Sequence, residues 1–209
     1  MRDARALGLG ELDAERCGRE LRALGREAFG EAGEGIVRLE ARGHGVLLGS
    51  TRTLGPDPAR WHAITVPVVH PGAGPAPGAK RAAVVELEQA RAAADAAGAD
   101  EALLFDASGH LVEGARTNLT LALADGRFVM PRLARGAVRG VALDAALAAG
   151  VPLAETDLSR DAVLRAREIV AINAGRGARP IVVLDGVPVG DGGPGPLHAC
   201  LDAALDAFR

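Results

Sequence analysis

The fold is decided by one stretch in the middle of the chain, residues 80–119, which reads KRAAVVELEQARAAADAAGADEALLFDASGHLVEGARTNL. Its first part, Arg81–Ala97, is rich in Ala, Glu and Arg, which favour a helix, and the glycine that follows can end it. Glu101–Phe105 and His110–Val112 predict two strands, because the residues between them have the composition of a hairpin turn. A helix followed by a hairpin indicates mixed α and β structure.

Short strands and helices continue towards the C-terminus. The predicted strands are Asn118–Leu123, Arg127–Met130, Ile169–Asn173 and Pro180–Leu184, and the predicted helices are Val141–Ala149, Ala162–Arg167 and Leu197–Phe208. Helices do not separate these strands regularly. The pattern therefore favours an α+β fold over a doubly wound parallel sheet.

The residues before Lys80 predict a second, smaller domain. Its expected elements are a helix at Leu12–Phe29 and strands at Ile36–Ala41 and Trp61–Val69. The segment 70–78 consists largely of Gly and Pro and suits neither helix nor strand, so we interpret it as a linker. We expect a small N-terminal domain with its linker at residues 1–77 and a larger domain at residues 78–209.

Composition excludes several classes of function. The chain has 209 residues, a formal charge of −3, four Phe, one Trp and no Tyr, and so lacks the basic stripe and stacking platforms of nucleic-acid binders. No apolar run approaches the ~18–20 residues that cross a bilayer, and the N-terminus does not resemble a signal peptide. Cys17 and Cys200 are too far apart in sequence to suggest a disulfide framework. We expect a cytoplasmic protein that binds neither nucleic acid nor membrane.

The lysine count is unusual. Of the 24 basic residues, Lys80 is the single lysine and the others are Arg, in a chain that also has 43 Ala. A lysine that survives such a bias can be one whose chemistry Arg cannot perform, because an amine loses its proton and attacks a carbonyl whereas a guanidinium does not. By itself the count favours a surface lysine that survived by chance, since lysines with special chemistry are a minority.

Four features of the second half match the needs of a pyridoxal phosphate enzyme. Such an enzyme requires a lysine for the aldehyde, an acid for the ring nitrogen and an anion site for the phosphate. Lys80 supplies the amine and Glu113 the acid, and a helix start at Gly140 or the turn after Asn173 supplies backbone N–H groups. Each feature alone is weak.

The order and spacing of these features resemble the class IV aminotransferases, the fold type IV pyridoxal phosphate enzymes. That family carries a Lys, a helix, a Gly-Ala-Asp-Glu-Ala strand, a hairpin and Glu-Gly-x-x-Ser/Thr-Asn-Leu. The matching positions are Lys80, Gly98–Ala102, Asp106–Gly109, Glu113-Gly114 and Thr117–Leu119, followed by Gly140-Val141, Asn173–Pro180 and Leu184–Gly186. The resemblance covers about residues 36 to 209.

The resemblance implies roles for individual residues. Lys80 is implied to be the catalytic Schiff-base lysine and Glu113 the carboxylate on the pyridine nitrogen. The other implied cofactor-binding residues are Asn118, Gly140, Val141, Ala142, Asn173 and Ala174, with the backbone N–H groups of Val141 and Ala142 and those after Asn173 holding the phosphate. Arg42, at the end of a strand, resembles a position where some members bind the substrate carboxylate. A homodimer is implied as well.

Departures from the family pattern define one alternative. Met1–Leu7 resembles the middle of the family's first helix, so we expect the first part of the small domain to be lacking. Ala142 replaces a common Thr, and Ile172 and Ala174 stand where a Ser or Thr often lies. Phosphate binding then rests on backbone donors. An inactive, cofactor-free member of the same fold is therefore the non-enzyme alternative.

The reaction is the least determined property. The broad expectation is an aminotransferase acting on an amino acid and a keto acid. The runner-up is a 4-amino-4-deoxychorismate lyase, because the chain lacks the Tyr that branched-chain members carry after the Lys and because residues 173–180 look more like the lyase group. A dinucleotide loop at 72–78 is disfavoured by its prolines, which remove amide donors. We expect no metal site, because His44, His62, His70, His110 and His198 share no ligand spacing.

Overall fold

The computed structural model describes residues 2–31, 33–74 and 76–206 and has an α+β fold. Contacts divide the chain into two compact units, Met1–Asp57 and Pro58–Arg209. This boundary lies earlier than the expected one at residues 77 and 78. The reason is that Trp61–Val69 (β3) pairs inside the sheet of the second unit. The described residues of the Gly- and Pro-rich segment, 70–74 and 76–78, therefore lie within the second unit and do not link the two units.

The first unit is a hairpin with a helix packed on it. It contains α1 (Arg2–Ala6), α2 (Ala14–Phe29), β1 (Gly35–Arg42), a short 3-10 turn at Gly43–Gly45 and β2 (Val46–Thr53). The helix α2 begins after Asp13, whose carboxylate accepts the Glu15 and Arg16 N–H groups, as an N-cap residue does. Leu24 of α2 lies so close to Gly49 of β2 that a Cβ there would be 2.3 Å from it.

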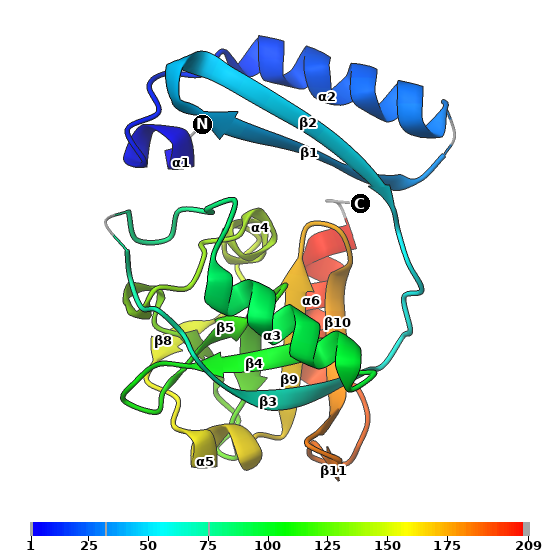
Figure 1. Cartoon of the computed structure of the whole chain (residues 1–209). Coiled ribbons are helices and arrows are strands. Elements are labelled where there is room, and N and C mark those ends of the chain that lie inside the picture. Colours follow the sequence, from blue (N-terminus) through cyan, green and yellow to red (C-terminus); the bar gives the residue numbers. More distant parts are fainter. Residues whose placement is uncertain (1, 32, 75, 207–209) are drawn as a thin grey trace. The chain divides into compact units, whose positions relative to one another are not determined.

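The second unit is built on one mixed sheet, whose strand order is β5-β4-β3-β10-β9-β6-β7-β8, with β11 paired to β10 (Figure 1). The strands are β4 (Glu101–Phe105), β5 (Leu111–Gly114), β6 (Asn118–Ala122), β7 (Phe128–Pro131), β8 (Ala154–Thr156), β9 (Glu168–Asn173), β10 (Gly177–Leu184) and β11 (Val187–Pro188). β3 is parallel to both of its neighbours, β4 and β10, and β7 is parallel to β8. The remaining pairs are antiparallel.

Alternating side chains fill hydrophobic cores on both faces of this sheet. In β9, Ile169 and Ala171 join one core together with Val163 of α5 (Arg160–Leu164), whereas Val170 and Ile172 join a second. That second core contains α4 (Val141–Ala148) and α6 (Pro196–Asp206). A third core lies where α3 (Val85–Ala96) packs on β3 and β4, as Figure 1 shows. The period of two along each strand determines which core a residue enters.

The predicted elements lie where the structure has them, apart from differences at some ends, but several further elements were not predicted. The predicted helix at Arg81–Ala97 begins only at Val85, because the backbone of its N-cap residue Val84 is extended. The strands β2, β8 and β11, the short helix α1 and the 3-10 turns were not predicted. Within the residues that the structure describes, the helices are all too short or too polar to traverse a bilayer.

Candidate functional site

Lys80 lies on the loop that joins β3 to α3, and its side chain is exposed. The preceding part of this loop packs on the segment before α4. The Arg139 N–H donates to the Gly78 carbonyl at 2.9 Å. Gly136, at φ +114°, lies so close to Gly72 that a Cβ on it would be 2.3 Å from the Gly72 carbonyl carbon. The loop that carries Lys80 is thus fixed against residues 136–139.

Glu113 is a buried carboxylate on β5, with 4% of its surface exposed. Its Oε2 accepts the Val138 N–H at 2.9 Å, and its Oε1 is 3.1 Å from Nε2 of His70. Among the described residues, His70 is the one basic side chain within 4.0 Å of this carboxylate. A carboxylate has about four lone-pair sites, so two remain for a further donor.

Asn118, the first residue of β6, also contacts the segment just before α4. Its Nδ2 donates to the Val138 carbonyl at 2.6 Å, and its Oδ1 accepts the Gly140 N–H at 3.2 Å. Gly140 must stay a glycine for this contact, since a Cβ there would be 2.4 Å from the Asn118 Oδ1. The conformation of the chain just before α4 therefore depends on this asparagine.

The segment 138–140 contacts Glu113, Asn118 and the loop that carries Lys80. Val138 binds Glu113 through its N–H, Arg139 binds the loop of Lys80, and Gly140 binds Asn118. These three residues are consecutive, so the Glu113 carboxylate and the backbone two residues before Lys80 are bound to adjacent amides.

The helix α4 begins directly after this segment without a side-chain cap. Gly140 is its N-cap residue and provides no side-chain acceptor for the amides of the first turn, which belong to Val141 and Ala142. Uncapped N–H groups and the helix dipole favour an anion at such a position. Asp144 lies near this end, but it forms an ion pair with Arg139 at 2.5 Å.

Asn173 shapes the turn between β9 and β10, and its role toward the cofactor stays a prediction. It ends β9, and its Oδ1 accepts the N–H groups of Gly175 and Arg176, which closes the turn into β10. The amides of Gly175 and Arg176 are therefore occupied by this side chain. The turn lies at the same end of the sheet as Asn118, because Asn118 pairs with Ile172.

Arg42 belongs to the first unit and ends β1. It is exposed, and its Nε donates to Oε1 of Glu40 at 3.0 Å. Its role on a substrate carboxylate remains a prediction.

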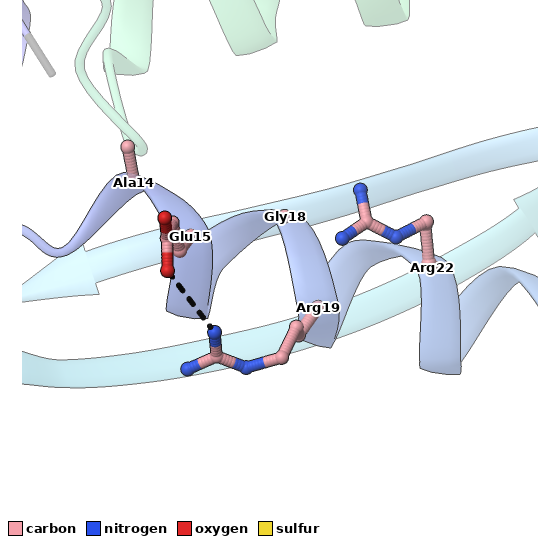
Figure 2. Close-up of a pocket in the computed structure, with 5 residues that line it drawn as sticks. All are labelled: Ala14, Glu15, Gly18, Arg19 and Arg22. Atoms are coloured by element: carbon pink, nitrogen blue, oxygen red, sulfur yellow. Dashed lines mark ion pairs between the residues drawn. The ribbon is translucent and has the colours of Figure 1, made fainter.

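A separate hollow lies on α2 and contains none of the predicted site residues. Figure 2 shows its lining, which consists of Ala14, Glu15, Gly18, Arg19 and Arg22. Its ion pair, Arg19 with Glu15 at 3.8 Å, is largely exposed, and such pairs contribute little. No group of three or more His, Cys, Asp or Glu in the described part of the chain is arranged to hold a metal ion.

Two acidic or basic residues near the site were not predicted to have a role. His70 was considered only as a metal ligand, and its contact with Glu113 joins residues 43 positions apart, which spacing cannot reveal. Glu101 is fully buried and accepts N–H groups of Ala102 and Arg116 and the hydroxyl of Thr117. Burial raises the pKa of Glu101 to about 7, although these donors act in the opposite direction.

The residues of this region fit pyridoxal 5′-phosphate. The buried Glu113 carboxylate has only His70 as a basic neighbour among the described residues, and so suits a protonated ring nitrogen. The uncapped start of α4 suits a phosphate. An exposed lysine on the loop bound to the same segment supplies the amine.

The chain is similar to known proteins both in sequence and in fold. The family model described as amino-transferase class IV matches residues 12–184. The branched-chain-amino-acid aminotransferase of Pseudomonas aeruginosa is 32% identical over 110 residues, which is 51% of this chain and 36% of that protein. The enzyme of the same name from Escherichia coli K12 is 30% identical over 112 residues, 52% of this chain and 36% of that protein. The matched part thus spans about a third of the length of these curated relatives.

Solved structures show the same fold. A candidate 4-amino-4-deoxychorismate lyase from Legionella pneumophila superposes with a TM-score of 0.81 at 21% identity, covering 99% of this chain and 81% of that one. The branched-chain amino acid aminotransferase from Escherichia coli superposes with a TM-score of 0.77 at 20% identity, covering 99% and 75%. These matches confirm the fold type IV-like architecture. The family model covers most of the sequence, and it establishes that the chain belongs to the class IV aminotransferase family.

Proposed function

We propose that this protein is a pyridoxal phosphate-dependent aminotransferase that transfers an amino group between an amino acid and a keto acid, with Lys80 as its reactive amine. One observation carries the proposal. Three consecutive residues, 138–140, bind the Glu113 carboxylate, the loop of Lys80 and the Asn118 side chain. Groups that need one another for this chemistry are thus attached to one short segment of backbone.

Each group has a task that suits its chemistry. Glu113 would accept a hydrogen bond from the ring nitrogen, and the first amides of α4, those of Val141 and Ala142, would hold the phosphate. Pyridoxal 5′-phosphate, when bound, supplies an electron-withdrawing ring that stabilises negative charge at the substrate α-carbon. Asn118 would keep the start of α4 in place, since it binds both Val138 and Gly140.

Lys80 would act twice. Its Nζ would hold the cofactor through the aldehyde group, and the same amine would move the proton at the α-carbon of the substrate. Both tasks require an amine that can lose its proton. A guanidinium in the same place would keep its charge and do neither.

The first experiment tests Lys80 directly. Purified protein is incubated with pyridoxal 5′-phosphate, reduced with borohydride and digested, and the modified peptide is identified by mass spectrometry. We expect the label on Lys80 and keto-acid-dependent amino transfer in the wild type. Lys80→Ala and Lys80→Arg should both abolish turnover, the second despite its charge. Activity in Lys80→Arg, or a label elsewhere, would contradict the proposal.

The same preparation separates the alternatives. Release of p-aminobenzoate from aminodeoxychorismate without amino transfer would indicate the lyase, which the turn at residues 173–180 and the fold shared with the Legionella protein support. A protein that takes up no cofactor would be the inactive member of the fold. A homodimer remains a prediction, which light scattering of the purified protein tests.

A further inference from the structure

His70 lies at the end of β3, ten residues before Lys80, and only 4% of its surface is exposed. Both of its ring nitrogens have partners. The Gly72 N–H donates to Nδ1 at 3.0 Å, and Nε2 lies 3.1 Å from Oε1 of Glu113. A buried histidine held at both nitrogens has a fixed ring orientation.

These contacts determine where the ring proton lies. Nδ1 accepts a hydrogen bond from Gly72, so it carries no proton. Nε2 must then carry the proton and donate it to the Glu113 carboxylate. The ring is neutral in this arrangement, and the second donor to Glu113, the Val138 N–H, is neutral as well. The carboxylate is thus held by two neutral donors.

We propose that His70 is a positioning residue for Glu113. As a neutral Nε2–H donor fixed by the Gly72 amide, it holds the carboxylate in the orientation that receives the ring nitrogen of the cofactor. This inference rests on the proposed function, because it assigns a group that acts on the cofactor only through Glu113.

The burial of the pair supports this role. Without the His70 donor, Oε1 of Glu113 would have no described protein partner, and the carboxylate could rotate about its last side-chain bond while Oε2 alone stayed bound to Val138. Hydrogen bonds to both oxygens fix the plane of the Glu113 carboxylate, whereas a hydrogen bond to one oxygen does not. A neutral donor also leaves the negative charge of the carboxylate uncancelled, which a cationic donor would not.

Two variants separate the two contacts of His70. In His70→Asn, the amide oxygen can take the place of Nδ1 and accept the Gly72 N–H, but no atom reaches Glu113. In His70→Gln, the longer side chain places an amide nitrogen near the position of Nε2, so the donor to Glu113 is restored. The matched pair therefore removes and restores one hydrogen bond.

The readout is the dissociation constant of two compounds, measured by equilibrium dialysis with the full chain. One is pyridoxal 5′-phosphate, and the other is its analogue with carbon in place of the ring nitrogen. We expect His70→Asn to weaken binding of the first about ten-fold or more and to leave the second unchanged, because only the first can bond to Glu113. His70→Gln should recover most of the loss.

A structural role alone would give another result. If His70→Asn weakened both compounds equally, or neither, His70 would not act through the ring nitrogen and the inference would be overturned. If the wild type bound neither compound, the proposed function itself would fail and the role of His70 with it. Thermal unfolding of the ligand-free variants checks that they fold.

A measurement on the wild type is independent of any variant. Nitrogen NMR of the ligand-free protein at neutral pH should find the His70 ring neutral, with its proton on Nε2. A proton on Nδ1 would contradict the geometry on which the inference rests.

Discussion

Glu101 illustrates at the residue scale how a conspicuous position can serve structure instead of catalysis. It has no exposed surface, and its carboxylate binds the turn of Arg116 and Thr117, directly before Asn118. A Cβ on Gly114 would be 2.7 Å from Oε2 of Glu101, so the neighbouring strand leaves no room for a larger residue. Glu101 thus supports the chain on which the site depends without belonging to it.

The raised pKa of Glu101 gives a pH-dependent stability. Because burial raises its pKa from 4.5 to about 7, the folded protein holds a proton that the unfolded chain has lost between these values. Its contribution to the free energy of unfolding is therefore complete below pH 4.5 and is lost as the pH rises through 7. Across this pH range the contribution of Glu101 to the free energy of unfolding falls by on the order of 3 kcal/mol.

Urea denaturation at pH 5 and pH 8 tests this expectation. The wild type should lose more stability between the two values than Glu101→Gln does, since the amide does not titrate. Glu88→Gln, at an exposed glutamate of α3, is the control and should behave as the wild type. Equal pH dependence in wild type and Glu101→Gln would show that the carboxyl is ionised throughout this range.

At the scale of the element, the two helices α4 and α6 begin in opposite ways. The first turn of α6 is capped by the buried Glu168 of β9, which accepts N–H groups of Gly195, Leu197 and His198 at 3.0, 3.0 and 3.1 Å. The start of α4 has no side-chain cap. A carboxylate at a helix start satisfies its amides and leaves no place for an anion. Of these two helix starts, that of α4 is the one without a side-chain acceptor and therefore the one that suits a phosphate.

Glu168→Ala should destabilise the protein by about 2 kcal/mol, because the amide of Gly195, just before α6, and those of Leu197 and His198 in its first turn lose a buried acceptor. Glu168→Gln should cost less, since its amide oxygen still accepts but carries no charge. Chemical denaturation of both variants measures the difference. A stability of Glu168→Ala within the error of the wild type would mean that water replaces the cap.

At the scale of the whole molecule, the hydrophobic core is distributed unequally. The three core clusters consist of residues from Trp61 onwards, within the second unit. In the described part of the first unit, Ala4 is the one buried hydrophobic residue, and α2 has none. Stability follows the apolar surface removed from water, so the second unit should hold most of it.

A fragment of residues 58–209 should accordingly fold by itself. We expect it to unfold cooperatively on heating and to keep the near-ultraviolet circular dichroism of Trp61, which is buried in its core. A fragment of residues 1–57 should show no cooperative transition. A non-cooperative 58–209 fragment would mean that the second unit depends on the first.

Local sequence determined much of this protein. The helix and hairpin of residues 80–119, the start of α4 after Gly140 and the strand β3 follow from propensity, turn residues and apolar periodicity, which act over a few positions. Lys80 and Glu113 could be named because their motifs are local too. The order of the strands could not, since β3 lies between β4 and β10, and β10 begins more than a hundred residues further along the chain.

Tertiary structure alone decided which groups meet. The pairing of His70 with Glu113, the three bonds made by residues 138–140 and the assignment of residues 58–77 to the second unit all join segments distant in sequence. Such contacts depend on how a twisted sheet and its loops pack. Packing involves many residues that are distant in sequence, so no short motif predicts it. The sequence therefore indicated the candidate groups, and the fold determined which backbone amides contact Glu113 and the loop of Lys80.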